Sequence, residues 1–238
     1  YLKSHDIDIP WEKAKYSINK GLWGTSIGGE ETLTSEKGLP DHAFPSQLTK
    51  TGKEHVTLTF EKGELIAVNG KKNAPEKNID ALENIASSYA IGRDIHVGDT
   101  IVGIKGRVGF EAAAALISIK AHHLLEKHTL TKWQLLHKEY LANFYGMHLH
   151  EGQYLDPVMR DMEAFLSSSQ EKVSGDVIVT LQPYHFSLDG VISDNDLMSS
   201  AFGSYGEMNT QWTAAEAKGF IKINGNQNKI YQQIHTTS

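Results

Sequence analysis

Apolar and polar residues alternate on both sides of Lys62-Gly63, in residues 55–60 and again in residues 64–69. A period of two is typical of a half-buried β-strand, and a Lys-Gly pair suits a tight turn between antiparallel strands. The sequence therefore predicts a two-stranded hairpin here. The preceding residues, 1–54, are rich in Gly, Ser, Thr and Pro, which predicts loops and short strands.

A helical period follows the hairpin and predicts a helix over residues 79–90 that ends before Gly92. Its apolar positions are Ile79, Leu82, Ile85, Ala86 and Tyr89. Residues 94–104 then predict two short strands around a Gly98-Asp99 turn.

Three long helices are predicted in quick succession, over residues 110–127, 131–145 and 157–169. Thr131 is a suitable cap for the second helix, and Asp156 with Pro157 suits the start of the third. Alternation then predicts strands at residues 176–181 and 184–188 and a turn at Asp189-Gly190.

The last segment, residues 213–235, is helix-like and has a narrow apolar stripe that would need a partner. The stripe consists of Phe220, Ile223, Ile230 and Ile234. Taken with the preceding elements, the pattern predicts an α+β fold. It would have a mixed, largely antiparallel sheet, a group of long helices and a protruding C-terminal helix.

Composition excludes several classes of function. The chain has 238 residues and a net charge of −6, so it should repel a phosphate backbone, and we expect no nucleic-acid partner. It has no cysteine, which excludes disulfides and thiol nucleophiles and favours a cytoplasmic location. The longest apolar run, residues 112–119, is far shorter than the ~20 residues that span a bilayer, so we expect no membrane partner.

Twelve histidines raise the alternative of a metal-dependent hydrolase. Nitrogen and oxygen ligands would suit zinc or manganese. However, no HExxH spacing occurs, and the adjacent His122 and His123 would point about 100° apart on a helix, so they cannot bind one ion together. We therefore expect no metal site and interpret these histidines as ordinary helix-surface or interface residues.

Two groups of polar residues could contact a ligand. Ser17 and Ser26 lie nine residues apart in a Gly-rich segment, where two hydroxyls can converge on one polar molecule, although turn and strand-start roles are also common for Ser. Arg93, Lys105 and Arg107 place three cations near one predicted sheet edge. They could bind a carboxylate or phosphate, or they could form structural ion pairs on a solvated face.

Three segments occur in one order: YSINKGLWGTS at residues 16–26, GRDIH at residues 92–96 and KGRVGFE at residues 105–111. Together they resemble the C-terminal half of argininosuccinate synthases, which have YSIDENLWGRS-like, GR-I and KSRGIYE-like segments. The resemblance extends from Tyr1 to about Ile234. The chain also starts without an initiator Met or a capping residue, so we expect a fragment that lacks the N-terminal, ATP-binding half of such an enzyme.

The resemblance implies that Ser17 and Ser26 contact citrulline. It also implies a Glu and a Tyr in the same site, and the matching positions here are Gly98 and Phe110. One carboxylate and one hydroxyl are therefore missing, unless Asp99 replaces the acid. Structural residues that shape the pocket would be Arg93, Lys105, Arg107 and Glu111.

The loss of the acid suggests a hypothesis about the substrate. A Glu would pair with the free α-ammonium of citrulline, whereas Gly98 removes both the charge and the bulk. An N-acylcitrulline, such as the succinyl or acetyl form, has no ammonium to pair. The enzyme would then accept an N-acylcitrulline, with His96 or Arg107 available to the added carbonyl or carboxylate; citrulline itself remains the alternative.

The resemblance further implies an ATP-dependent ligase of arginine biosynthesis that condenses citrulline with aspartate. ATP with Mg²⁺, and aspartate, would bind mainly to the missing half. Residues 1–210 would form the citrulline-binding synthetase domain, and residues 211–238 would be a C-terminal oligomerisation helix of a homotetramer. A noncatalytic assembly or binding domain of the same fold is the alternative.

Overall fold

The computed structural model describes residues 2–7, 15–199 and 211–236. They belong to two compact units, Tyr1–Asn195 and Asp196–Ser238, and each unit is described by itself. The predicted domain boundary at residues 210 and 211 borders a segment outside the described residues. The α+β class is confirmed, although the strands form two antiparallel sheets rather than one mixed sheet.

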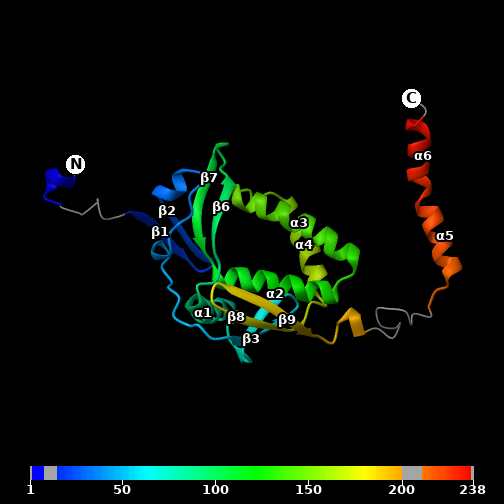
Figure 1. Cartoon of the computed structure of the whole chain (residues 1–238), viewed down its shortest axis with the longest axis horizontal. Helices are drawn as coiled ribbons and strands as arrows, with labels where there is room; N and C mark the ends of the chain where they lie inside the picture. The colour runs from blue at the N-terminus through cyan, green and yellow to red at the C-terminus, as the bar shows by residue number, and fades with distance from the viewer. Residues whose placement is uncertain (1, 8–14, 200–210, 237–238) are drawn as a thin grey trace. The chain divides into compact units, whose positions relative to one another are not determined.

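The first unit contains a four-stranded antiparallel sheet with the order β1-β2-β7-β6 (Figure 1). Its strands are β1 (Tyr16–Gly21), β2 (Gly24–Gly29), β6 (Arg93–Asp99) and β7 (Lys105–Glu111). All three sequence segments that carry the family resemblance therefore lie on or next to this sheet, although up to 95 residues separate their ends along the chain. We call it the motif sheet.

A second antiparallel sheet has the order β5-β4-β3-β8-β9. Its strands are β3 (Glu54–Glu61), β4 (Glu64–Val68), β5 (Lys71–Lys72), β8 (Gly175–Gln182) and β9 (His185–Ile192). The hairpin predicted around Lys62-Gly63 is confirmed as β3 and β4. We call this sheet the core sheet.

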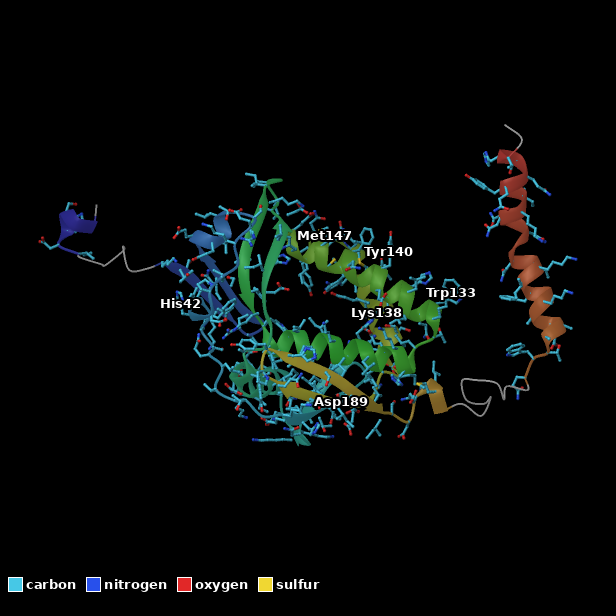
Figure 2. All side chains as sticks on the ribbon, in the orientation of Figure 1. His42, Trp133, Lys138, Tyr140, Met147 and Asp189 are labelled. Atoms are coloured by element: carbon cyan, nitrogen blue, oxygen red, sulfur yellow. The ribbon has the colours of Figure 1, made fainter. Side chains whose placement is uncertain are left out.

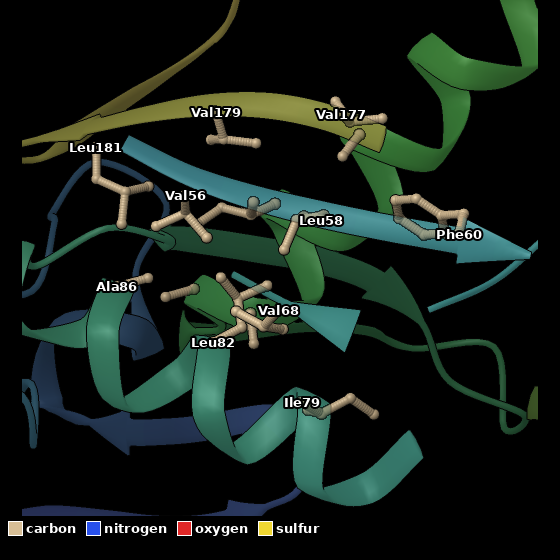
Figure 3. Close-up of a cluster of buried hydrophobic side chains, with 14 of the residues drawn as sticks. Val56, Leu58, Phe60, Val68, Ile79, Leu82, Ala86, Val177, Val179 and Leu181 are labelled. Carbon is tan, nitrogen blue, oxygen red and sulfur yellow. The ribbon is translucent and has the colours of Figure 1, made fainter. Parts of the chain in front are cut away.

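The main hydrophobic core lies on one face of the core sheet, where α1 (Pro75–Ala86) and α2 (Ala113–Thr129) cover it. In Figure 3, Val56 and Leu58 of β3 lie opposite Leu82 of α1. Burying each side chain of this size contributes roughly 1.5–3 kcal/mol, so this layer is the main stabilising element of the unit.

Two predicted turns are wrong, because both dipeptides lie inside strands. Gly98-Asp99 belongs to β6, and the turn is made by residues 100–104, where the Thr100 hydroxyl donates to the Ile104 carbonyl at 2.7 Å. Asp189 is the extra residue of a β-bulge in β9, since Ile178 pairs with Gly190 and Val179 pairs with Leu188. The β8–β9 turn is residues 183–184, between the two predicted strands, and β9 continues through Asp189-Gly190.

The predicted helices exist, but their bounds differ. Helix α1 starts at Pro75, a residue that favours the first helical position, and a short 3-10 turn, η5 (Ser87–Tyr89), follows its end. Helix α2 starts at Ala113 rather than at residue 110, because Phe110 and Glu111 complete β7.

The next two helices are α3 (Lys132–His150) and α4 (Val158–Gln170). Thr131 caps α3 as predicted, since its hydroxyl oxygen accepts a hydrogen bond from the Gln134 amide. The Asp156 carboxylate accepts from the Val158 amide at 2.9 Å, but the N-cap residue is Pro157 rather than Asp156, because α4 starts one residue later than predicted. The remaining 3-10 turns are η1 (Leu2–His5), η3 (Glu30–Leu33), η4 (Asp41–Ala43) and η6 (Leu197–Ser199).

Helix α2 receives its N-terminal cap from another helix. Its own N-cap residue, Ala112, has no side chain that could accept a hydrogen bond. The Glu83 carboxylate of α1 accepts from the Ala114 amide at 2.8 Å instead. Burial raises the pKa of Glu83, and this amide bond opposes the shift. Helix α1 therefore fixes the start of α2 next to the motif sheet.

Large apolar side chains are exposed along α3. Trp133, Tyr140 and Met147 follow one another on this helix in Figure 2, and all three are more than half exposed. Seven residues separate each from the next, so they lie near one face of the helix. Among the described residues, no helix combines the length and the apolar composition that crossing a bilayer requires.

The second unit contains α5 (Ala214–Asn224) and α6 (Asn226–His235). Thr213 caps α5 through a capping box with Glu216, and Gly225 separates the two helices. The predicted helical segment is therefore confirmed as two helices. Its four apolar stripe residues are all exposed within this unit.

Candidate functional site

The register of the motif sheet places the four predicted citrulline-site residues on one face. Ser26 lies directly opposite Phe110, and Ser17 lies opposite Gly28, two residues farther along β2. Gly98 lies on β6, four residues beyond Asp94, which is the partner of Phe110. Residues opposite each other, and every second residue along a strand, share a face.

The four residues are nevertheless unequally close. Ser26 and Phe110 are neighbours on adjacent strands, whereas β1 and β6 are the two edges of the sheet. Three strand spacings of about 4.8 Å separate these edges, so Ser17 and Gly98 are on the order of 14 Å apart or more. A ligand that contacts both would have to lie across the whole sheet face.

The predicted supporting residues lie on the opposite face of the motif sheet, by the same alternation. The Arg107 guanidinium donates to three backbone carbonyls, including that of Glu31 at 2.8 Å. Arg93 donates to the Ser46 carbonyl, and its Nε lies 3.5 Å from Glu111 Oε2. These contacts hold residues 31–46 on that face.

Arg107 is therefore committed to the backbone and does not face the serines. Of the two groups proposed to meet an added acyl group, only His96 lies on the face of Ser17 and Ser26. Lys105 forms an ion pair with Asp99 on the supporting face. The three cations near the sheet edge thus do not converge on one point.

His96 occupies the space beside Gly98. A Cβ atom added to Gly98 would come within 2.8 Å of His96 Nε2, so the imidazole lies where a longer side chain at position 98 would begin. Asp99 faces away from Gly98 by strand alternation and pairs with Lys105. The geometry therefore gives no support to Asp99 as the replacement for the missing acid.

Phe110 separates the serine-bearing strands from a cavity. A Cβ atom added to Gly24 would lie 2.7 Å from Phe110 Cε1, so the ring rests directly on the Gly24 backbone. Phe110 and His96 line a cavity of about 820 Å³. Its other walls come from residues 90–95, from the start of α2, and from the β8–β9 turn with the start of β9.

Two residues with an unfavourable backbone conformation line this cavity. Ala90 has a φ of 55° and Tyr184 has a φ of 62°, values in the left-handed region that non-glycine residues seldom adopt. The Tyr184 amide donates to the Tyr89 carbonyl at 2.8 Å, which helps to hold the turn in place. Such strain costs on the order of 1 kcal/mol per residue and is enriched at ligand sites.

A second polar cluster lies at the junction of α2, α3 and α4. The Glu126 side chain is fully buried, accepts from Lys138 at 2.8 Å and from Gln170 at 2.9 Å, and lies near His122 and His123. Within the described ranges, no three His, Asp or Glu side chains are grouped so that they could hold a metal ion. The adjacent histidines therefore contact a buried carboxylate in this fold.

The pH dependence of stability should report on His122. Burial lowers the pKa of His122, while the unfolded chain protonates this group near pH 6.5. The unfolded state thus binds more protons between the lowered pKa and 6.5, so the free energy of unfolding should fall as pH drops through this window. In urea titrations from about pH 7.5 to about pH 5, His122→Gln should have a shallower pH slope than wild type. An unchanged slope would contradict this assignment.

Sequence reasoning missed the cavity residues contributed by α2 and the β8–β9 turn. Lys120, Tyr184 and His185 belong to segments with no shared motif. Only the Gln-Pro-Tyr-His sequence around residue 183 offered a local signal for a turn there.

The motif sheet thus carries the exposed Ser17 and the half-buried Ser26 on the face that also bears Phe110, which lines the cavity. The family model described as the arginosuccinate synthase C-terminal domain matches residues 16–231. The chain therefore belongs to the argininosuccinate synthase family, and it corresponds to the C-terminal domain.

Curated relatives support this family. The chain is 33% identical over 238 residues to the argininosuccinate synthase of Xanthomonas campestris pv. campestris, covering 99% of this chain and 59% of that protein. It is 35% identical to that of Dictyoglomus turgidum, covering 97% and 58%, and 32% identical to that of Methanocaldococcus jannaschii, covering 98% and 59%. The chain thus spans less than two thirds of the length of these relatives.

Proposed function

We propose that this chain is the citrulline-binding part of an argininosuccinate synthase that acts in arginine biosynthesis in the cytoplasm. The observation that carries the proposal is the shared sheet face of Ser17, Ser26, Gly98 and Phe110 beside a large cavity. The family match over residues 16–231 also supports it.

The reaction proposed is the condensation of citrulline with aspartate. The ureido oxygen of citrulline attacks the α-phosphorus of ATP, and the bond to the β-phosphate oxygen breaks, so that pyrophosphate leaves. The aspartate amine then attacks the ureido carbon and displaces AMP, and a proton is released. Such chemistry depends on positioning and on electrostatic stabilisation of phosphoryl transfer more than on a protein nucleophile.

The chain's own residues would bind and orient citrulline. The hydroxyls of Ser17 and Ser26 would contact its polar groups, since both lie on the open face of the sheet. Arg93 and Arg107 lie on the opposite face, where they would hold residues 31–46 against the sheet. Lys105, paired with Asp99, would stiffen the end of the β6–β7 hairpin.

ATP and Mg²⁺ are assigned to the part of the family's length that this chain does not span. Among the described residues, no three His, Asp or Glu side chains are grouped so that they could hold a metal ion by themselves. The sequence also has no GxxxxGK phosphate-binding segment. We expect this chain alone to be inactive, because ATP is proposed to bind mainly outside it.

The C-terminal unit is proposed to join subunits of a homotetramer. Its exposed stripe (Phe220, Ile223, Ile230 and Ile234) is apolar along two successive helices and would be buried by a neighbouring chain. A variant of the natural protein that is truncated after Thr210 should therefore elute from a size-exclusion column as a species smaller than a tetramer. An unchanged tetramer would contradict this role, and a four-residue substitution of the stripe by Ser is a second test.

The main proposal is tested by measuring pyrophosphate release by the complete natural protein. The assay contains ATP, aspartate and either citrulline or an N-acylcitrulline. Ser26→Ala should lower kcat/KM by about tenfold, the value of one net hydrogen bond. Ser167→Ala, on the exposed side of α4, is the matched control and should leave the rate unchanged. No release with any form of citrulline would favour a noncatalytic domain of this fold, an alternative that the missing carboxylate and hydroxyl support.

A further inference from the structure

The cavity beside Phe110 contains positively charged and imidazole groups that have no acidic partner. Within the described part of the chain, Lys120, His96 and His185 form no ion pair, although all three line the cavity. The Lys120 ammonium lies 5.8 Å from the centroid of the Phe186 ring, and the His185 ring stacks against the same Phe186. Lys120 is thus held near the cavity by an aromatic ring rather than by a carboxylate.

The other charged residues that line the cavity are Arg93 and Asp94. The Arg93 guanidinium donates to the Ser46 carbonyl on the supporting face of the motif sheet. The Asp94 carboxylate accepts from the Ile95 amide at 2.7 Å. Of the two cations in this cavity, Lys120 is consequently the one whose hydrogen-bond donors are left for a ligand, and its chemistry suits a carboxylate.

The rest of the lining suits a short hydrocarbon spacer. Ala112, Ala115, Leu116 and Ile119 contribute apolar surface from the start of α2, between Phe110 and Lys120. Two successive turns of one helix therefore lead from the aromatic ring beside Ser26 to the unpaired ammonium. A ligand that fits has a polar head at the sheet, an apolar middle and an anionic end.

We propose that this cavity is a subsite for a carboxylate-terminated acyl arm on the α-nitrogen of the amino-acid substrate. Lys120 binds the terminal carboxylate, His185 donates a further hydrogen bond to it, and His96 donates to the acyl carbonyl beside Gly98. The inference rests on the proposed function, because it takes the position of the citrulline head from Ser17 and Ser26. The cavity should therefore favour an acyl group derived from a dicarboxylic acid, such as succinyl, over an acetyl group.

The structure accounts for the preference in two ways. His96 fills the space beside Gly98, so an acidic side chain that would pair with a free ammonium is replaced by a hydrogen-bond donor. A cavity of about 820 Å³ also leaves more room than an acetyl group needs, and Lys120 lies about two helical turns along α2 from its start beside Phe110. The terminal carboxylate of a succinyl group would extend toward Lys120, whereas the methyl group of an acetyl group is shorter and has no charge to pair with it.

The test compares kcat/KM for pyrophosphate release by the complete natural protein with citrulline, N-acetylcitrulline and N-succinylcitrulline. N-succinylcitrulline should be the best substrate. Lys120→Met should reduce its kcat/KM by about 10- to 100-fold, mainly through KM, because a charged hydrogen bond is lost. The same variant should change turnover of N-acetylcitrulline less than about threefold. Lys127→Met, an exposed lysine on the same helix outside the cavity, is the matched control.

Several results would overturn the inference while leaving the ligase in place. One is turnover of citrulline alone, with Asp94→Asn abolishing it, which would make Asp94 the partner of a free ammonium. Another is an equal effect of Lys120→Met on all three substrates. Free succinate that binds as tightly as N-succinylcitrulline would also overturn it, since the carboxylate would then not belong to the substrate.

Binding separates the inference from the proposed function if nothing is turned over. Calorimetric titration of the same protein with N-succinylcitrulline should give binding that Lys120→Met weakens by about tenfold or more. That result without pyrophosphate release would retain the subsite and reject the ligase. Absence of both binding and release would reject both.

Discussion

Gly92→Ala should lower the free energy of unfolding by about 2–4 kcal/mol, measured by urea denaturation. Gly92 has a φ of 82°, which is unfavourable for any residue with a Cβ atom. That atom would also lie 2.6 Å from the Ala112 carbonyl carbon and from the Ala113 nitrogen. Both are backbone atoms, so no side-chain rotation can relieve the clash.

The effect should extend to the candidate site, because Gly92 is where β6 meets the start of α2. The Ala112 amide donates to the Gly92 carbonyl at 3.0 Å, and this contact sets the distance between the motif sheet and the helix that carries Lys120. We therefore expect Gly92→Ala to impair binding of N-succinylcitrulline even below the unfolding transition.

Gly70→Ala is the matched control for Gly92→Ala. Gly70 has a φ of 74°, but a Cβ atom there would meet no heavy atom within 4 Å. It should therefore show only the conformational cost of about 1 kcal/mol. Equal losses of stability in the two variants would mean that the close contact with α2 contributes nothing.

The sequence predicted most elements of the fold because their signals are local. The hairpin at Lys62-Gly63 has both the alternation of apolar and polar residues and the turn that two antiparallel strands require. Thr131 is a residue type that favours the N-cap position, and it caps α3. The turns at Gly98-Asp99 and Asp189-Gly190 were wrong because their glycines lie inside paired strands. Pairing with a neighbouring strand overrides a dipeptide preference.

The candidate site was less accessible from sequence, because it depends on register. With the turn at residues 100–104, Gly98 lies opposite Gly106 and shares a face with Phe110, whereas Arg107 lies on the other face. A shift of one residue would exchange these faces. The cavity groups on α2 and on the β8–β9 turn are brought together only by tertiary packing, which no local pattern records.

Lys138→Met should lower the free energy of unfolding by about 3 kcal/mol, because it removes the charged partner of a buried carboxylate. The Glu126 side chain has no exposed surface, and the Lys138 ammonium lies 2.8 Å from its Oε2 atom. Figure 2 labels Lys138 on α3, whereas Glu126 belongs to α2, so the pair joins the two helices. Urea denaturation at neutral pH measures the loss.

Burial, rather than ion-pair distance, is the reason for this expectation, and a second pair in the chain tests it. Lys50 lies 2.7 Å from Glu54, but both side chains are substantially exposed. Lys50→Met should therefore change stability by less than about 1 kcal/mol. The double variant Glu126→Gln with Lys138→Met should recover much of the loss, since no buried charge remains. If the double variant were no more stable than Lys138→Met, the packing of the Lys138 side chain rather than its charge would explain its role. Apolar contacts would then stabilise the junction between α2 and α3.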